Sequence, residues 1–202
     1  MNSKIILVAL SLVFLTGCAS YNALPLNSMS SEVIDVTKPA MRTDVTIAAK
    51  ALSRSECIRY FDRDVIEKGY LPVQLYIQNN TKNAYVFSLN RVSLSVARPE
   101  VVAAKVHTST VGRAVGYGAG ALLLWPLAIP AVVDGIKSAR ANQALDADFD
   151  AKCAQDQIIS MHSHMNKVLF VPRSEFDSSF TVTLVDAESH TPKTIQVQVQ
   201  RS

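Results

Sequence analysis

The chain lacks three short motifs that mark common classes of enzyme. Its 202 residues contain no His-Glu-x-x-His, no Gly-x-Ser-x-Gly and no phosphate-binding loop. Charged side chains are scarce, at 18% of residues, and the formal net charge is only +3. Without a basic run or a basic helix face, this charge is too small to indicate a nucleic-acid partner. The apolar content of 49% is, by contrast, ample for a hydrophobic core.

Cysteine is also rare, and the first of the three cysteines closes an export-type leader. The basic Lys4 precedes an apolar run, Ile5–Phe14, and the small residues Thr16 and Gly17 lead to Cys18. This order is typical of a signal peptide, here residues 1–17, that is removed from the mature protein. The small-residue site before cysteine resembles the lipobox of bacterial lipoproteins. That resemblance implies cleavage before Cys18 and acyl chains on its thiol and on the new amino terminus.

The residues after Cys18 bear on the location of the protein. In lipoproteins of this kind, Asp directly after the lipidated cysteine often marks inner-membrane retention, and here Ala19 and Ser20 follow. The resemblance therefore implies an envelope protein anchored in the outer membrane through its acyl chains. Residues 18–31 are rich in Ser and Asn and predict a tether, which ends where one folded domain, 32–202, begins. The thirteen residues after Cys18, 19–31, reach at most about 45 Å.

The other two cysteines, Cys57 and Cys153, form an even pair in a chain predicted to fold outside the cytoplasm. An oxidising compartment favours a disulfide between them. The bridge would close a loop of 96 residues, which stabilises a fold by up to ~4.7 kcal/mol in the chain-entropy account. The alternative is two separate buried thiols, because nothing in the sequence fixes the distance between them.

Alternating apolar and polar residues predict an antiparallel arrangement of short strands. The clearest case has Val73, Leu75 and Ile77 on one face, followed by the turn-forming cluster 79–83. Strands are predicted at 33–36, 44–51, 71–78, 85–89, 92–96, 167–171, 179–186 and 194–200. This number favours a mainly β protein of the α+β class, an immunoglobulin-like β-sandwich without the Cys-Trp-Cys spacing of a true immunoglobulin domain.

One helix is predicted between the first strands. Ser53 and Glu56 fit a capping box, and an apolar stripe that includes Phe61 and Val65 follows. Gly69 stands where a C-terminal cap is expected.

A helical insertion at about 99–161 is predicted to split the sandwich. Its centre, 114–133, has twenty consecutive residues without charge, the length of a membrane span. The small residues Gly112, Gly116 and Gly120 share one helix face and permit close helix contact. Pro126 and Pro130 argue against a straight span, and Trp125 with Pro126 fits a turn between two short helices. Two alternatives stay open: contact with a membrane or a second copy, and a helical pair packed as a lid on the sandwich.

His162 and His164 are the one candidate metal pair, since alternate residues of a strand face the same way. A site needs further ligands, and the spacing fixes none. The leading hypothesis is therefore a non-enzymatic, lipid-anchored binding or assembly module without a cofactor, with an envelope partner or a second copy bound near the membrane. The second hypothesis is a lipoprotein that binds a hydrophobic small ligand or lipid, and the third is a metal-dependent hydrolase using His162 and His164.

Overall fold

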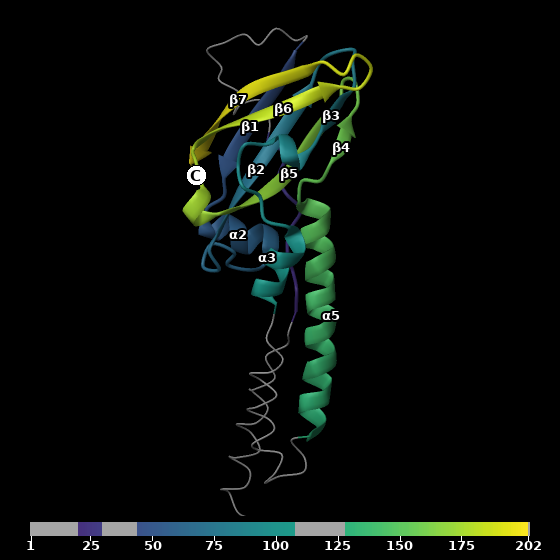
Figure 1. The fold of residues 1–202 in the computed structure, drawn as a ribbon. Coiled ribbons are helices and arrows are strands. Elements are labelled where there is room, and N and C mark those ends of the chain that lie inside the picture. The colour runs from purple at the N-terminus through teal and green to yellow at the C-terminus, as the bar shows by residue number, and fades with distance from the viewer. Residues whose placement is uncertain (1–19, 30–43, 108–127, 202) are drawn as a thin grey trace, which may run out of the picture. The chain divides into compact units, whose positions relative to one another are not determined.

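The computed structural model describes residues 20–29, 44–107 and 128–201 (Figure 1). The chain divides into two compact units, residues 1–22 with 107–147 and residues 23–106 with 148–202. We call the second the sheet unit, because its residues supply the seven strands. The boundary between the units falls within helix α5 (Ala128–Lys152). In the described part of the chain, no helix is both long and apolar enough to cross a membrane.

The strands form one mixed sheet in the order β4-β3-β6-β7-β1-β2-β5. Their bounds are Val45–Ala51 (β1), Tyr70–Asn79 (β2), Tyr85–Phe87 (β3), Gln157–Ile159 (β4), His164–Pro172 (β5), Ser179–Asp186 (β6) and Pro192–Arg201 (β7). Neighbouring strands are antiparallel except β1 and β7, which pair in parallel, with Ala49 opposite Val199. After β3, Val92 bridges to β6, and Ala97 bridges to the edge strand β5. The segment between these two residues therefore connects distant parts of the sheet, and the sheet is nearly closed.

The pairing confirms a mixed α+β protein made mostly of strands, but it does not confirm the immunoglobulin-like sandwich. The parallel pair of β1 and β7 joins all strands into a single sheet, whereas a sandwich holds two sheets face to face. Alternation along a strand decides which face is buried and leaves the partner strand undetermined. Within the predicted strand 92–96, only Val92 pairs with the sheet, as an isolated bridge to Val182.

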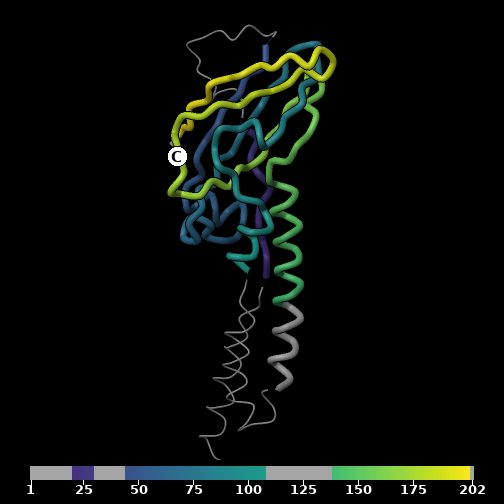
Figure 2. The backbone as a smooth tube through the Cα atoms, in the orientation of Figure 1, coloured from purple at the N-terminus to yellow at the C-terminus, as the bar shows by residue number. Residues whose placement is uncertain are grey.

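The inner face of the sheet holds the main core. Alternate residues of β2 point inward, and Val73, Leu75 and Ile77 are fully buried there. On β6 the same alternation buries Phe180, Val182 and Leu184, as the sequence predicts. The hairpin of β6 and β7, yellow in Figure 2, brings further apolar side chains to this face.

Helix α2 (Arg54–Phe61) begins as predicted and ends earlier than expected. The capping box is formed: the Ser53 hydroxyl accepts from the Glu56 amide, and the Glu56 carboxylate accepts from the Ser53 amide at 2.9 Å. Asp62 then adopts a left-handed conformation, with φ of 51°, and ends the helix. The prediction that Gly69 caps this helix is wrong. Gly69, with φ of +90°, instead serves the tight turn that leads into β2.

In the described part of the predicted insertion, residues 99–107 and 128–161, the helices are α3 (Pro99–Val106) and α5. The insertion also contains a strand, because β4 pairs with β3 and places Tyr85 opposite Ile159. The chain therefore returns to the sheet before residue 161. Short 3₁₀ turns, η3 (Leu89–Arg91) and η5 (Arg173–Glu175), follow β3 and β5.

The outer face of β5 is covered by an aromatic cluster. The ring of Phe170 lies 5.3 Å from the rings of Phe61 on α2 and Phe149 on α5, and those two rings are 4.9 Å apart. Within the sheet unit, this cluster fixes α2 and the last turns of α5 to one end of the sheet. Figure 1 shows α2 and α3 together at that end.

Candidate functional site

The segment that follows the proposed lipidation site lies against the outer face of the sheet. The backbone amide of Leu24 donates to the carbonyl of Arg59 on α2 at 2.9 Å. The carbonyl of Asn27 accepts from the side-chain amides of Gln74 at 2.7 Å and Asn166 at 3.1 Å. These hydrogen bonds explain why the polar Gln74 is buried on a strand.

Met29 completes this attachment with an apolar contact. It is only 6% exposed and packs with Ala48 of β1 and Tyr76 of β2. Residues 23–29, which the sequence predicts as part of a tether, therefore belong to the sheet unit. Their composition gives no sign of this, because their partners are Arg59 on α2 and residues of β1, β2 and β5, all of which come later in the chain.

Two large apolar side chains remain exposed where this segment meets α2. Leu24 is 54% exposed and Ile58 is 47% exposed. Single exposed apolar residues are common on protein surfaces. Here, however, the hydrogen bond from Leu24 to Arg59, the neighbour of Ile58, brings the two exposed side chains to the same part of the sheet unit. Leu24 also follows Cys18 closely in the chain.

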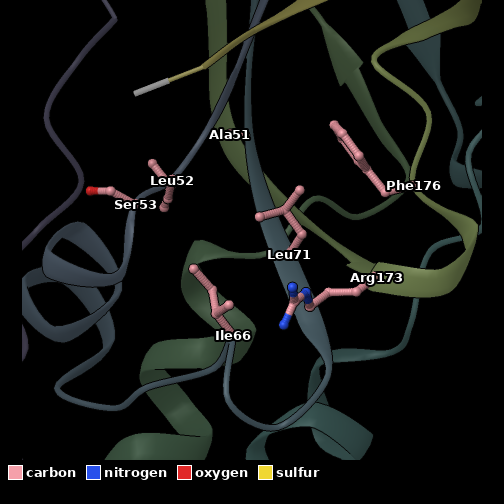
Figure 3. Close-up of a pocket in the computed structure, with 7 residues that line it drawn as sticks. All are labelled: Ala51, Leu52, Ser53, Ile66, Leu71, Arg173 and Phe176. Carbon is pink, nitrogen blue, oxygen red and sulfur yellow. The ribbon is translucent and has the colours of Figure 1, made fainter.

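A pocket of about 410 Å³ opens at the same end of the sheet (Figure 3). Four strongly apolar side chains form most of its wall, and one arginine and one serine supply polar groups. The lining residues are Ala51, Leu52, Ser53, Ile66, Leu71, Arg173 and Phe176. The volume lies within the range of small-molecule sites, about 300–1,000 Å³.

The pocket is assembled where several elements end. Ala51 ends β1, Ser53 caps α2, and Leu71 lies at the start of β2. Arg173 begins η5, and its backbone amide donates to the carbonyl of Gly69 at 3.0 Å. Figure 3 shows the Arg173 side chain extending toward Leu71 and Ile66. No local spacing in the sequence predicts this grouping or marks Arg173 as a pocket residue.

Cys57 and Cys153 are both buried and are free thiols in the structure. Burial is the main cause that raises the pKa of Cys57 to about 12, and the nearby Asp64 and Glu56 carboxylates add to it. Burial likewise raises the pKa of Cys153, where Asp150 is the chief charged neighbour. The two thiols thus have different charged neighbours. The disulfide stays a prediction for the exported protein.

The two histidines of the candidate metal pair occupy different settings. His162 lies in the turn before β5, with φ of 53°. The His164 ring stacks on Tyr76, with ring centres 5.6 Å apart. Within residues 20–29, 44–107 and 128–201, no group of three His, Cys, Asp or Glu side chains is placed to hold a metal ion. The described residues therefore give the hydrolase hypothesis no support.

The remaining predicted residues, Cys18, Gly112, Gly116, Gly120 and Trp125, lie outside the described residues. The chain matches no protein-family model, no curated protein and no solved structure.

Proposed function

We propose that the protein is a non-enzymatic, lipid-anchored envelope protein that acts as a binding or assembly module held close to a membrane surface. The lipobox resemblance at Cys18 provides the anchor. The observation that carries the proposal is the attachment of residues 23–29 to the sheet, because it leaves only five residue steps between Cys18 and the sheet unit. Five extended steps reach at most about 18 Å. The sheet unit therefore works next to the membrane, not at the end of a long tether.

The short connection also supports one end of the sheet, the end with α2, as the one that meets the membrane or an envelope partner. Leu24 is bonded to α2, so the end with α2 is the one nearest the anchor. The exposed Leu24 and Ile58 side chains lie there. Apolar side chains of this kind add favourable burial when they enter a lipid interface or a protein contact.

The anchor is tested by metabolic labelling. Radiolabelled palmitate should enter the wild-type protein and be absent from Cys18→Ala. Label that persists in Cys18→Ala would rule out the lipobox proposal.

The orientation is tested by crosslinking in intact envelopes. A photoreactive amino acid at Ile58 should crosslink to lipid or to an envelope protein. The matched control replaces Glu188, exposed in the turn between β6 and β7. Because β1 and β7 are parallel, this turn lies at the opposite end of the sheet from α2. Equal crosslinking at both positions would contradict the orientation, and the crosslinked protein would identify the partner.

A second function is favoured by the pocket at the α2 end. Its apolar wall and single arginine suit a hydrophobic small ligand, and this function is compatible with the anchor.

A further inference from the structure

The pocket beside α2 combines an apolar wall with one positive charge. Leu52, Ile66, Leu71 and Phe176 form the wall, and Arg173 extends across it toward Leu71 and Ile66 (Figure 3). Leu52 is 2% exposed, while the other three are partly exposed and so line an accessible surface. A ligand that covers this wall gains from the removal of apolar area from water.

The charge of Arg173 is not neutralised within the described part of the chain. There, its guanidinium takes part in no hydrogen bond and no ion pair, whereas Arg54 pairs with Asp64 and Arg63 with Asp62. Glu56, the carboxylate of the capping box beside the pocket, pairs with Lys50 at 2.6 Å. Glu175 and Asp177, which flank Phe176 in the chain, are both exposed, and in the described residues neither forms an ion pair with Arg173. The pocket thus offers one positive group to an incoming ligand.

A hydrogen bond fixes the backbone of Arg173 beside the pocket. The bond from its amide to the Gly69 carbonyl ties η5 to the turn that carries Ile66. A guanidinium presents a planar pair of N–H donors that matches a carboxylate, and one such pair balances one negative charge.

We propose that this pocket binds a monoanionic amphiphile, with a carboxylate on Arg173 and an apolar body over Leu52, Ile66, Leu71 and Phe176. The proposal deepens the second function given above and does not depend on the lipid anchor. Loss of palmitate labelling at Cys18 and loss of ligand binding are therefore separate results.

Photolabelling of the full chain in envelope vesicles tests this proposal. The probe is a medium-chain carboxylic acid that carries a diazirine on its alkyl chain. We expect adducts on peptides that contain Leu71 or Phe176, located by mass spectrometry. Unlabelled octanoate should compete with the probe, whereas octylamine, of similar size and opposite charge, should not. Equal competition by octylamine, or adducts spread over the whole chain, would overturn the proposal.

Variants locate the charge that the ligand needs. Arg173→Gln should raise the octanoate concentration needed for half-competition about tenfold, because a charge-assisted hydrogen bond is lost. Arg91→Gln, which removes another exposed arginine, on η3, should change nothing. Arg173→Lys keeps the charge without the planar pair and should give an intermediate value. The role of Arg173 would be refuted if Arg173→Gln and wild type needed the same octanoate concentration for half-competition. Thermal melting curves must show that both proteins are folded.

A further competitor distinguishes the anionic group. Heptyl phosphate carries the same seven-carbon alkyl chain as octanoate, on a group that can hold two charges. If it competes much more strongly than octanoate, the carboxylate assignment is wrong.

Discussion

At the scale of single residues, Asn79 joins two turns through its buried side-chain amide. The Nδ2 atom donates to the carbonyls of Asn83 at 2.7 Å and Ser160 at 2.9 Å. The Oδ1 atom accepts from the amide and hydroxyl of Thr81 at 3.0 and 2.8 Å. Every polar atom of this fully buried side chain therefore has a partner.

Asn79→Asp should destabilise the fold strongly. The substitution replaces a donor with an acceptor that faces two carbonyls, so we expect a loss of about 2–4 kcal/mol in the free energy of unfolding. Urea unfolding measures it. Asn90→Asp, at an exposed position on η3, is the matched control and should cost little. Similar losses for the two variants would show that the Asn79 network adds nothing to stability.

The buried thiols give a second prediction at this scale. Because the pKa of Cys57 is raised to about 12 and that of Cys153 is also raised, neither forms the reactive thiolate near neutral pH. Iodoacetamide should therefore alkylate neither cysteine in reduced, folded protein and both after unfolding, as seen by mass spectrometry. An exposed cysteine placed by Ser189→Cys is the control. Native Cys57 reacting as fast as this control would contradict the prediction. The same reagent tests the disulfide. If neither cysteine is alkylated in protein that is unfolded by guanidinium without reduction, Cys57 and Cys153 are joined.

At the scale of elements, Lys152 ties the end of α5 to α2. Its buried ammonium donates to the Tyr60 carbonyl and to the Asp148 carboxylate, both at 2.6 Å, and lies above the Phe61 ring. A buried charge without its counter-charge is costly, whereas an apolar replacement of similar shape is tolerated.

Removing the acid of this pair should therefore cost more than removing the base. We expect Asp148→Asn to lower the free energy of unfolding by about 1–3 kcal/mol, since Asp148 is partly exposed. Lys152→Met should cost less, because the stem still packs on Phe61 and no charge is buried. Chemical denaturation of both variants decides between them. A larger loss for Lys152→Met would mean that the bond to Tyr60 dominates.

The Asp186 carboxylate, at the start of the turn between β6 and β7, should make the free energy of unfolding depend on pH in the acid range. The Asp186 carboxylate accepts from the Ser189 amide at 2.9 Å and from Asn83 Nδ2 at 2.6 Å, and these bonds hold its pKa below the ordinary value of 3.8. The folded pKa is therefore lower than the unfolded one. Its stabilising contribution is complete above the unfolded pKa and is lost as pH falls through the folded pKa.

Asp186→Asn should therefore lose less stability on acidification than the wild type does. The comparison is the urea midpoint at about pH 7 and about pH 3. Glu188→Gln, which changes an exposed acid of the same turn, should keep the wild-type acid sensitivity. Identical acid sensitivity in Asp186→Asn and wild type would show that Asp186 does not contribute.

The elements also show which parts of the fold local sequence can predict. Strands β2 and β6 were predictable because the face of each that lines the main core is strongly apolar, which gives the sequence a repeat of two. The start of α2 was predictable because a capping box is a local interaction. Its end was not, because the helix stops where Asp62 adopts a left-handed conformation, and the apolar stripe does not predict that. Val65, which continues the apolar stripe in the sequence, lies in a turn after α2. The helical repeat alone does not distinguish such a turn residue from a further turn of helix.

At the scale of the whole molecule, the main failure of sequence reasoning concerns which segments meet. Strands β1 and β7 begin almost 150 residues apart, and nothing in their alternation indicates a parallel pair. The pocket has the same character, since its walls come from the ends of distant elements. Cys18, in contrast, was identified as a candidate from one short segment, because a processing signal is read as a linear sequence.

The attachment of residues 23–29 gives the last prediction, since it sets the reach of the anchor. Met29→Asp places a charge against Ala48 and Tyr76 and removes the burial of one apolar side chain, about 1.5–3 kcal/mol. We expect the segment to detach while the sheet stays folded. Hydrogen exchange should then become faster at the Leu24 amide, which is bonded to Arg59, and stay slow in β2. Ser28→Asp, at an exposed neighbouring position, controls for the added charge. If exchange at Leu24 is unchanged in Met29→Asp, the hydrogen bonds to Asn27 hold the segment without Met29. If β2 exchanges faster as well, the segment is part of the fold itself, and the sheet unit cannot move farther from the membrane without unfolding.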